Sequence, residues 1–442
     1  MAYARLVPLV AVAAGILAVA CSSVSDATSP SESAARSQAA AGQPVPPASS
    51  GTVGSSLVPV PSTDPPKLNG SAPKLDETSP VVSERIELLD DEPPRFLTFG
   101  WKTDFSRHSV PFDEILSGGP PRDGIPPIDN PKYHDVSDAP TYMVANEPVI
   151  SVEINGDARA FPLAILISHE IVNDEIGGVP VTITYCPLCN TAIVFDRRVG
   201  DRVLDFGTSG NLRHSDLVMW DRQTESWWQQ ISGEAIVGEL TGTKLTFIPA
   251  PLVSWSAFRD SFPDGKVLSR DTGFARNYDL PPYSGYDELG NIPFLFSGDI
   301  DDRLQAVERV VTLNVGDVAV AYPFEALEDQ PVINDTINGQ DVVIFFAGGT
   351  LSAFAGRSYS DNRAVGSTGV YEPVVDGQKL TFKVEADVIV DEETGSKWNI
   401  LGIAVEGPLE GSRLAPVVHA NHFWFAWAAF NPETEIRTGA AG

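Results

Sequence analysis

The chain is poor in cysteine, methionine and basic residues. The shortages of basic residues and of cysteine each exclude a class of protein. Its 442 residues include 3 cysteines and 3 methionines, and 30 Lys and Arg stand against 59 Asp and Glu, a formal net charge of −29. A surface this acidic repels phosphate backbones, so the sequence predicts no nucleic-acid partner. The cysteines are too few for a disulfide scaffold.

The N-terminus predicts export and a lipid anchor. After Arg5, the apolar run LVPLVAVAAGILAVA leads directly to Cys21. It is too short for a convincing membrane span and predicts a signal peptide over residues 1–20. Because its end resembles a bacterial lipoprotein signal, we expect Cys21 to be lipidated and to anchor the protein to the extracytoplasmic face of the bacterial cell membrane. Residues 21–93, rich in Ser, Pro and Ala, predict a disordered stalk.

From about residue 94 the sequence predicts a mainly β fold, a β-rich α+β class with short helices. Alternating apolar and polar residues surround Asn155-Gly156, a dipeptide typical of tight hairpins. One short helix is expected in SWSAFRDSF (254–262), with Ser254 as its cap.

The chain repeats itself. VISVEINGDARAFPLAIL (149–166) aligns with VVTLNVGDVAVAYPFEAL (310–327), and further matches follow in the same order. We expect a tandem duplication that gives two pseudo-symmetric β-barrel- or sandwich-like units, 94–300 and 301–442.

The two copies differ at one chemically distinctive set of residues. The first copy has His169 and the pair Cys186 and Cys189, whereas Gln330 and Ala347 stand at the positions of the first two in the second copy, and all three residues are missing there. Residues that only fill the hydrophobic core would be needed equally in both copies. The presence of the His and Cys residues in one copy alone therefore favours a dedicated site in the first unit.

Thiolate and imidazole ligands suit zinc and copper, and soft sulfur favours copper(I). The sequence therefore predicts a copper or zinc site of His169, Cys186 and Cys189, with Met219 as a weak fourth ligand, for metal handling or electron transfer. The sequence does not identify the protein partner or metal donor of such a site. His214 is a weaker candidate for the same site. His419 and His422 stand at i and i+3, a spacing compatible with metal, but their aromatic neighbours favour a role in the core or at an interface.

Two other interpretations stay open. Cys186 and Cys189 could be the redox pair of a thiol–disulfide oxidoreductase, or they could form a structural disulfide in a non-catalytic envelope module. A thioredoxin-like site needs a helix after its C-x-x-C, whereas TAIVFD (191–196) predicts a strand here. No G-x-S-x-G elbow, P-loop, dinucleotide fingerprint or H-E-x-x-H is present, so the sequence does not decide whether the chain is an enzyme.

Several strings together resemble one bacterial family. They are HEIVND (169–174), TYCPLC (184–189), SGNLRHSDLVMWDRQTESWWQQ (209–230) and LSRDTGFARNYDLPPY (268–283). The chain is similar over roughly residues 95–440 to the family catalogued as domain of unknown function 3179. The resemblance implies an exported, often lipid-anchored protein without an established activity, and it places the family's His and C-x-x-C on His169, Cys186 and Cys189.

Overall fold

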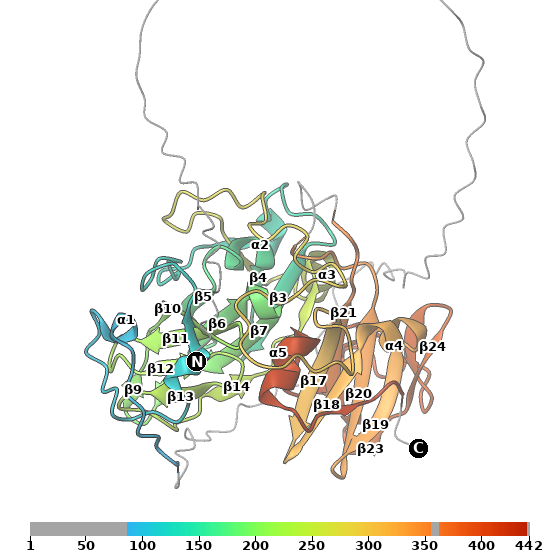
Figure 1. The fold of residues 1–442 in the computed structure, drawn as a ribbon. Coiled ribbons are helices and arrows are strands. Elements are labelled where there is room, and N and C mark those ends of the chain that lie inside the picture. Colours follow the sequence, from blue (N-terminus) through green and yellow to red (C-terminus); the bar gives the residue numbers. More distant parts are fainter. Residues whose placement is uncertain (1–85, 355–361, 440–442) are drawn as a thin grey trace, which may run out of the picture. The chain divides into compact units, whose positions relative to one another are not determined.

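The computed structural model describes residues 86–354 and 362–439 (Figure 1). The expected signal peptide, the lipidation of Cys21 and almost all of the stalk lie outside the described residues. The fold is mainly β, as predicted, and no sheet in the described part closes into a barrel. The helices are few and short: α1 (Arg95–Thr98), α2 (Leu163–Leu166), α3 (Trp255–Ser261), α4 (Phe324–Asp329) and α5 (Trp424–Phe430), with single 3-10 turns η1 (Phe112–Glu114), η2 (Val136–Asp138) and η3 (Pro187–Cys189).

Three sheets and a small ribbon form from residues 115–268. One sheet has the order β14-β7-β6-β5, a second β15-β3-β4-β16-β2 and a third β1-β10-β11-β12-β13, and β8 pairs with β9. The strands are β1 (Ile115–Ser117), β2 (Tyr133–Asp135), β3 (Pro148–Ile154), β4 (Asp157–Pro162), β5 (Ile171–Ile176), β6 (Val179–Cys186), β7 (Thr191–Asp196), β8 (Arg198–Val199), β9 (Arg202–Val203), β10 (Phe206–Arg213), β11 (Asp216–Asp221), β12 (Trp227–Gln229), β13 (Glu234–Val237), β14 (Thr246–Ile248), β15 (Leu252–Ser254) and β16 (Lys266–Leu268).

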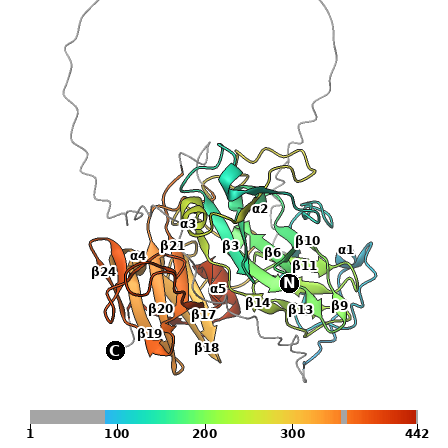
Figure 2. The same ribbon diagram turned by 180° about the vertical axis from the view of Figure 1, so that it is seen from behind.

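Residues 309–436 form a second set of sheets. Their orders are β29-β17-β18-β30, β19-β20-β21-β28 and β24-β25-β26-β27, and β22 pairs with β23. Figure 2 shows β17 to β21 and β24 of this set from behind. The strands are β17 (Arg309–Val315), β18 (Val318–Pro323), β19 (Val332–Ile337), β20 (Gln340–Ala347), β21 (Ser367–Glu372), β22 (Val374–Val375), β23 (Gln378–Lys379), β24 (Phe382–Glu385), β25 (Val388–Asp391), β26 (Lys397–Trp398), β27 (Ala404–Glu406), β28 (Ala415–Pro416), β29 (Ala420–Phe423) and β30 (Glu435–Ile436).

The two sets repeat one topology. β3 to β6 contain 7, 6, 6 and 8 residues, and β17 to β20 have the same four lengths. In each set the second strand of this group of four also pairs in parallel with a strand near the C-terminal end of the same set. These pairs are β4 with β16 and β18 with β30. This recurrence agrees with the alignment of the two copies in the sequence.

The contacts between the two sets are reciprocal. β29 of the second set packs beside β7 of the first, and β15 of the first packs beside β21 of the second. β15 corresponds to β29, and β7 corresponds to β21. Each set therefore contacts the other through the same pair of strands, as a twofold axis requires. One apolar core cluster draws residues from both sets, among them Cys186, Met219 and Phe423.

The hairpin turn and the helix cap that the sequence predicted are both present in the fold. Asn155 and Gly156 both have positive φ and join Ile154 to Asp157 in the β3–β4 hairpin. The Ser254 side chain accepts a hydrogen bond from the amide of Ala257 at the start of α3, which confirms the predicted cap. None of the helices in the described ranges is long and apolar enough to cross a membrane.

Candidate metal centre at Cys186, Cys189 and Asp216

The two cysteines lie on a tight connection between strands β6 and β7. Cys186 is the last residue of β6, and Cys189 ends the 3-10 turn that Pro187 begins. Asn190 then takes a left-handed conformation (φ 52°), which returns the chain to β7 so that Thr191 pairs with Cys186. The motif is therefore strand–turn–strand with no helix after it, as its sequence predicted.

A second tight turn brings a carboxylate to the same place. The β10–β11 hairpin closes through His214 and Ser215, whose φ values of 51° and 69° are both positive, as a type I′ turn requires. Asp216 follows as the first residue of β11. One oxygen of Asp216 and the sulfurs of Cys186 and Cys189 all lie within 4.8 Å of one another. Three potential metal ligands thus converge from two hairpins.

Asp216 is held by hydrogen bonds on one oxygen only. Its Oδ2 accepts from Nε2 of Gln229 at 2.6 Å and from the amide of Ile231 at 3.0 Å. Its Oδ1 is buried and has no hydrogen-bond partner within the described residues. Burial raises the pKa of Asp216 to about 7. The thiols of Cys189 and Cys186 interact with this carboxylate and partly offset the rise in its pKa.

Both thiols are free and buried. The Sγ of Cys186 donates a weak hydrogen bond, 3.7 Å long, to the backbone oxygen of Ser215. Burial raises the pKa of Cys186, and it raises the pKa of Cys189 further above the ordinary thiol value. In the absence of a metal, the two sulfurs are therefore protonated at neutral pH.

A second acid, Glu170, lies near this cluster. Glu170 has a φ of 60°, a strained value for a non-glycine residue, and is only 6% exposed. Burial, and then the neighbouring Asp216, raise its pKa to about 8. Two buried acids and two buried thiols therefore share this part of the core.

His169 lies outside the group of converging ligand atoms. Its Nδ1 donates to the backbone oxygen of Pro126 at 2.7 Å, because a carbonyl can only accept. Its Nε2 must then accept from the Tyr278 hydroxyl, also at 2.7 Å. Burial lowers the pKa of His169, consistent with a neutral ring. Both ring nitrogens are thus occupied by protein partners, and the expected metal role of His169 gains no support from its contacts.

The other predicted residues are distributed around the cluster. Met219 is buried in β11 within the apolar core cluster that also contains both cysteines, and its role as a thioether ligand stays a prediction. His214 donates from Nδ1 to the backbone oxygen of Ser297. His422, from the second set of sheets, shares a 2.7 Å hydrogen bond with Thr191, and burial lowers its pKa to about 3.

All three converging residues are absent from the second set. Cys186 ends β6, and Ala347 ends the equal-length β20. The hairpin of β24 and β25 also turns through two residues of positive φ, and Val388 follows it in the place of Asp216. Sequence reasoning missed Asp216, although comparing the two hairpin turns would have shown that an acid is lost there as well.

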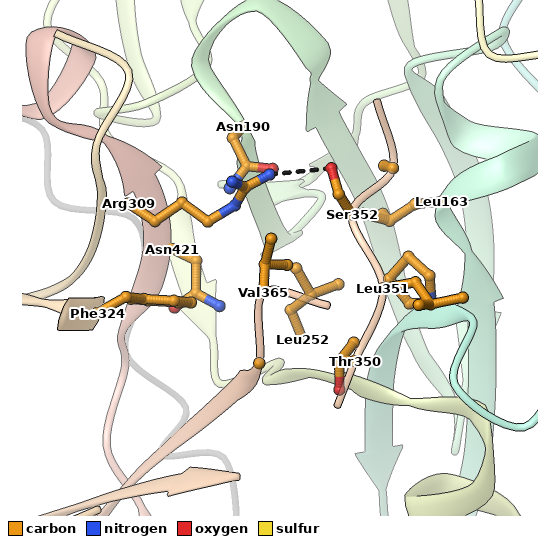
Figure 3. A pocket seen from close by; sticks show the side chains of 13 residues that line it. Leu163, Asn190, Leu252, Arg309, Phe324, Thr350, Leu351, Ser352, Val365 and Asn421 are labelled. Atoms are coloured by element: carbon orange, nitrogen blue, oxygen red, sulfur yellow. Dashed lines mark hydrogen bonds between the residues drawn. The ribbon is translucent and has the colours of Figure 1, made fainter. Parts of the chain in front are cut away.

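The cluster is closed to solvent. A small cavity of about 10 Å³, the space of one water molecule, lies beside Asn190 and is lined by Arg309 and Ser352, which hydrogen-bond each other (Figure 3). A wider depression of about 480 Å³ lies over Asp129, Arg159 and Arg197. Neither cysteine lines either of these two cavities. Cys186, Cys189 and Asp216 are each at most 1% exposed, so a ligand would reach the thiols only after part of the chain moves.

Comparison with known proteins gives a family and no activity. No curated protein and no solved structure matches the chain. One family model matches residues 122–434, which span both sets of sheets and the cysteine cluster. The chain belongs to the family described as protein of unknown function (DUF3179).

Proposed function

We propose that the chain binds one thiophilic metal ion, zinc or copper(I), through Cys186, Cys189 and Asp216. The observation that carries this proposal is the convergence of the two sulfurs and a carboxylate oxygen within 4.8 Å, all buried. Oδ1 of Asp216 is buried and forms no regular hydrogen bond in the described chain, and the two thiols interact with the same carboxylate. A bound cation would satisfy it and would also favour the charged forms of both thiols.

The donor set favours zinc over copper(I). Zinc accepts thiolate and carboxylate ligands together, whereas copper(I) selects soft sulfur. Three protein ligands leave one position of a tetrahedral ion for another group, and the occupied nitrogens of His169 argue against that residue. Together with the expected export and lipid anchor at Cys21, this supports a role in metal handling at the bacterial cell envelope.

Thiol–disulfide exchange is the weaker alternative. The two sulfurs lie within 4.8 Å of each other, but exchange with another protein needs an exposed sulfur of low pKa. Here both sulfurs are buried and burial raises both pKa values. A structural disulfide is also less favoured, because the two cysteines are free.

The test is the metal content of the full-length chain, purified anaerobically and measured by mass spectrometry beside a thiol titration. We expect about one zinc or copper ion per chain, lost in Cys186→Ser, Cys189→Ser and Asp216→Asn and retained in His169→Gln. Met219→Leu is the volume-matched control, and loss of metal in this variant would make Met219 a ligand. No metal in the unmodified chain, with Cys186 and Cys189 oxidised to a disulfide, would overturn the proposal.

A further inference from the structure

A long segment without helix or strand contacts the turn beside the cysteine cluster, where the hydroxyl of Ser215 bonds to the backbone oxygen of Phe294. It comprises residues 269–308, between the end of β16 at Leu268 and the start of β17 at Arg309, and we call it the strap. Irregular segments of about 40 residues are uncommon in compact domains and usually have a function. The strap also contains the predicted boundary between the two units at residues 300 and 301.

Two tyrosines of the strap pack against the part of the core that contains the thiols. Tyr283 and Tyr286 pack against the apolar core cluster that contains both cysteines. Burial raises the pKa of Tyr283, and the neighbouring Glu170 and Cys186 raise it further. Burial likewise raises the pKa of Tyr286, with smaller contributions from the two cysteines. Tyr286 also joins the strap to the turn beside Cys186: its hydroxyl oxygen accepts from the amide of Phe294, whose backbone oxygen accepts from the hydroxyl of Ser215.

The strap is fixed firmly at one point. Asp287 directly follows Tyr286, and its carboxylate accepts from Arg309 at 2.7 Å, from Arg363 at 2.9 Å and from the hydroxyl of Ser352 at 2.7 Å. Asp287 and Arg309 are both buried. A buried, fully bonded pair of charges is costly to break, so this point stays in place when other parts of the strap move.

On the N-terminal side of Asp287 the strap is held mainly by exposed contacts. Asp271 and Asp279 pair with Lys132 and Arg270, but both carboxylates are largely exposed, and such ion pairs contribute little to stability. Next to Tyr286, the amide of Gly285 also donates to the backbone oxygen of Phe354. The Tyr278 hydroxyl donates to Nε2 of His169 at 2.7 Å, and the Thr272 hydroxyl lies 2.6 Å from the same tyrosine oxygen. Around this contact Phe274 and Leu280 are 44% and 54% exposed, so these apolar side chains contribute little burial. Segments with few buried apolar contacts open at low free-energy cost.

We propose that residues 271–286 form a gate over the Cys186–Cys189–Asp216 site, latched by the hydrogen bond between Tyr278 and His169 and hinged at Asp287. The proposal rests on the proposed metal site for its purpose, since the gate would admit the ion and then exclude water. It also gives His169 a role that is not ligation. Gln330 stands at the corresponding position of the second unit, where there are no thiols to cover.

The test is alkylation of the two cysteines by iodoacetamide in the native, metal-free, full-length chain, read by mass spectrometry of the peptide that carries both. When closing is faster than alkylation, the rate reports the population of the open gate. A net hydrogen bond contributes about 1 kcal/mol, so Tyr278→Phe and His169→Leu should each alkylate about fivefold faster. The matched control is Tyr322→Phe, which removes a buried tyrosine hydroxyl bonded to Asp335, far from the strap in sequence.

Unchanged alkylation in both latch variants would overturn the gate. So would an equal increase in Tyr322→Phe, because the thiols would then be exposed by unfolding of the whole chain. A second readout uses zinc and a chromogenic chelator: uptake and release should both accelerate in Tyr278→Phe, while the affinity stays the same. If neither zinc nor copper(I) binds, the proposed function fails, whereas the alkylation result still decides the gate.

Discussion

The side-chain amide of Gln229 donates to Oδ2 of Asp216 at 2.6 Å, and this contact leaves Oδ1 of the carboxylate directed away from its hydrogen-bonded side. The partner that orients a metal ligand commonly matters almost as much as the ligand itself. Gln229 lies in β12, next to β11 in the same sheet, so the sheet fixes both members of the pair.

Replacing Gln229 with Leu should weaken zinc binding by about 10- to 100-fold, because the carboxylate loses the donor that orients it. Competition with a chelator of known affinity measures the change. The neighbouring Gln230, also buried, bonds to Thr184 and Thr191 and not to Asp216, which makes Gln230→Leu the matched control. Equal losses in the two variants would show a general packing defect.

Metal binding should become tighter as pH rises. Burial raises the pKa of both thiols, so the metal-free chain holds both protons at neutral pH, and a thiolate-binding ion must displace them. We expect the release of about two protons per ion, and a further fraction from Asp216, whose pKa is raised to about 7. Calorimetry in two buffers of different ionisation enthalpy counts these protons. Binding without proton release would exclude thiolate ligands.

Glu170 should make the metal-free chain less stable in alkaline solution. Burial raises its pKa from 4.5 to about 8, so the folded chain retains a proton that the unfolded chain has lost. The stability that this group contributes is present below about pH 4.5 and is lost as pH rises through 8. Relative to Glu170→Gln, the unmodified chain should lose on the order of 3 kcal/mol between pH 5 and pH 9 in urea unfolding. Parallel pH profiles for the two proteins would contradict a buried, neutral Glu170.

The hydrogen bond between Thr191 and His422 should couple the two sets of sheets. The two residues are 2.7 Å apart and both are buried, so Thr191→Val leaves the imidazole nitrogen without this partner. We expect a loss of about 1–2 kcal/mol in the free energy of unfolding. A double-mutant cycle with His422→Leu measures the coupling energy between the two side chains. A coupling energy near zero would show that the contact does not stabilise the fold.

Short stretches of sequence were sufficient for the parts of the fold that depend on neighbouring residues. The Asn155-Gly156 turn, the Ser254 cap and the strand after Cys189 were all predicted correctly, because positive φ, capping and β-branched patterns act within a few residues. The repeat predicted that one strand order would occur twice. The proximity of Cys186 and Cys189 was equally local, since three positions in a tight turn bring two sulfurs together.

Tertiary structure alone decided which groups join the cysteines. Asp216 reaches them because the β10–β11 hairpin lies against the end of β6, and no local pattern marks an aspartate at the start of a strand as a ligand. His169 looked like a ligand by its chemistry, but its nitrogens bond to Pro126 and Tyr278, which are 43 and 109 residues away along the chain. The sequence by itself determined the two thiols and the turn that holds them together. Packing between distant segments determined the carboxylate that completes the cluster and the contact of the strap with the turn beside it, because such contacts depend on the register of whole sheets.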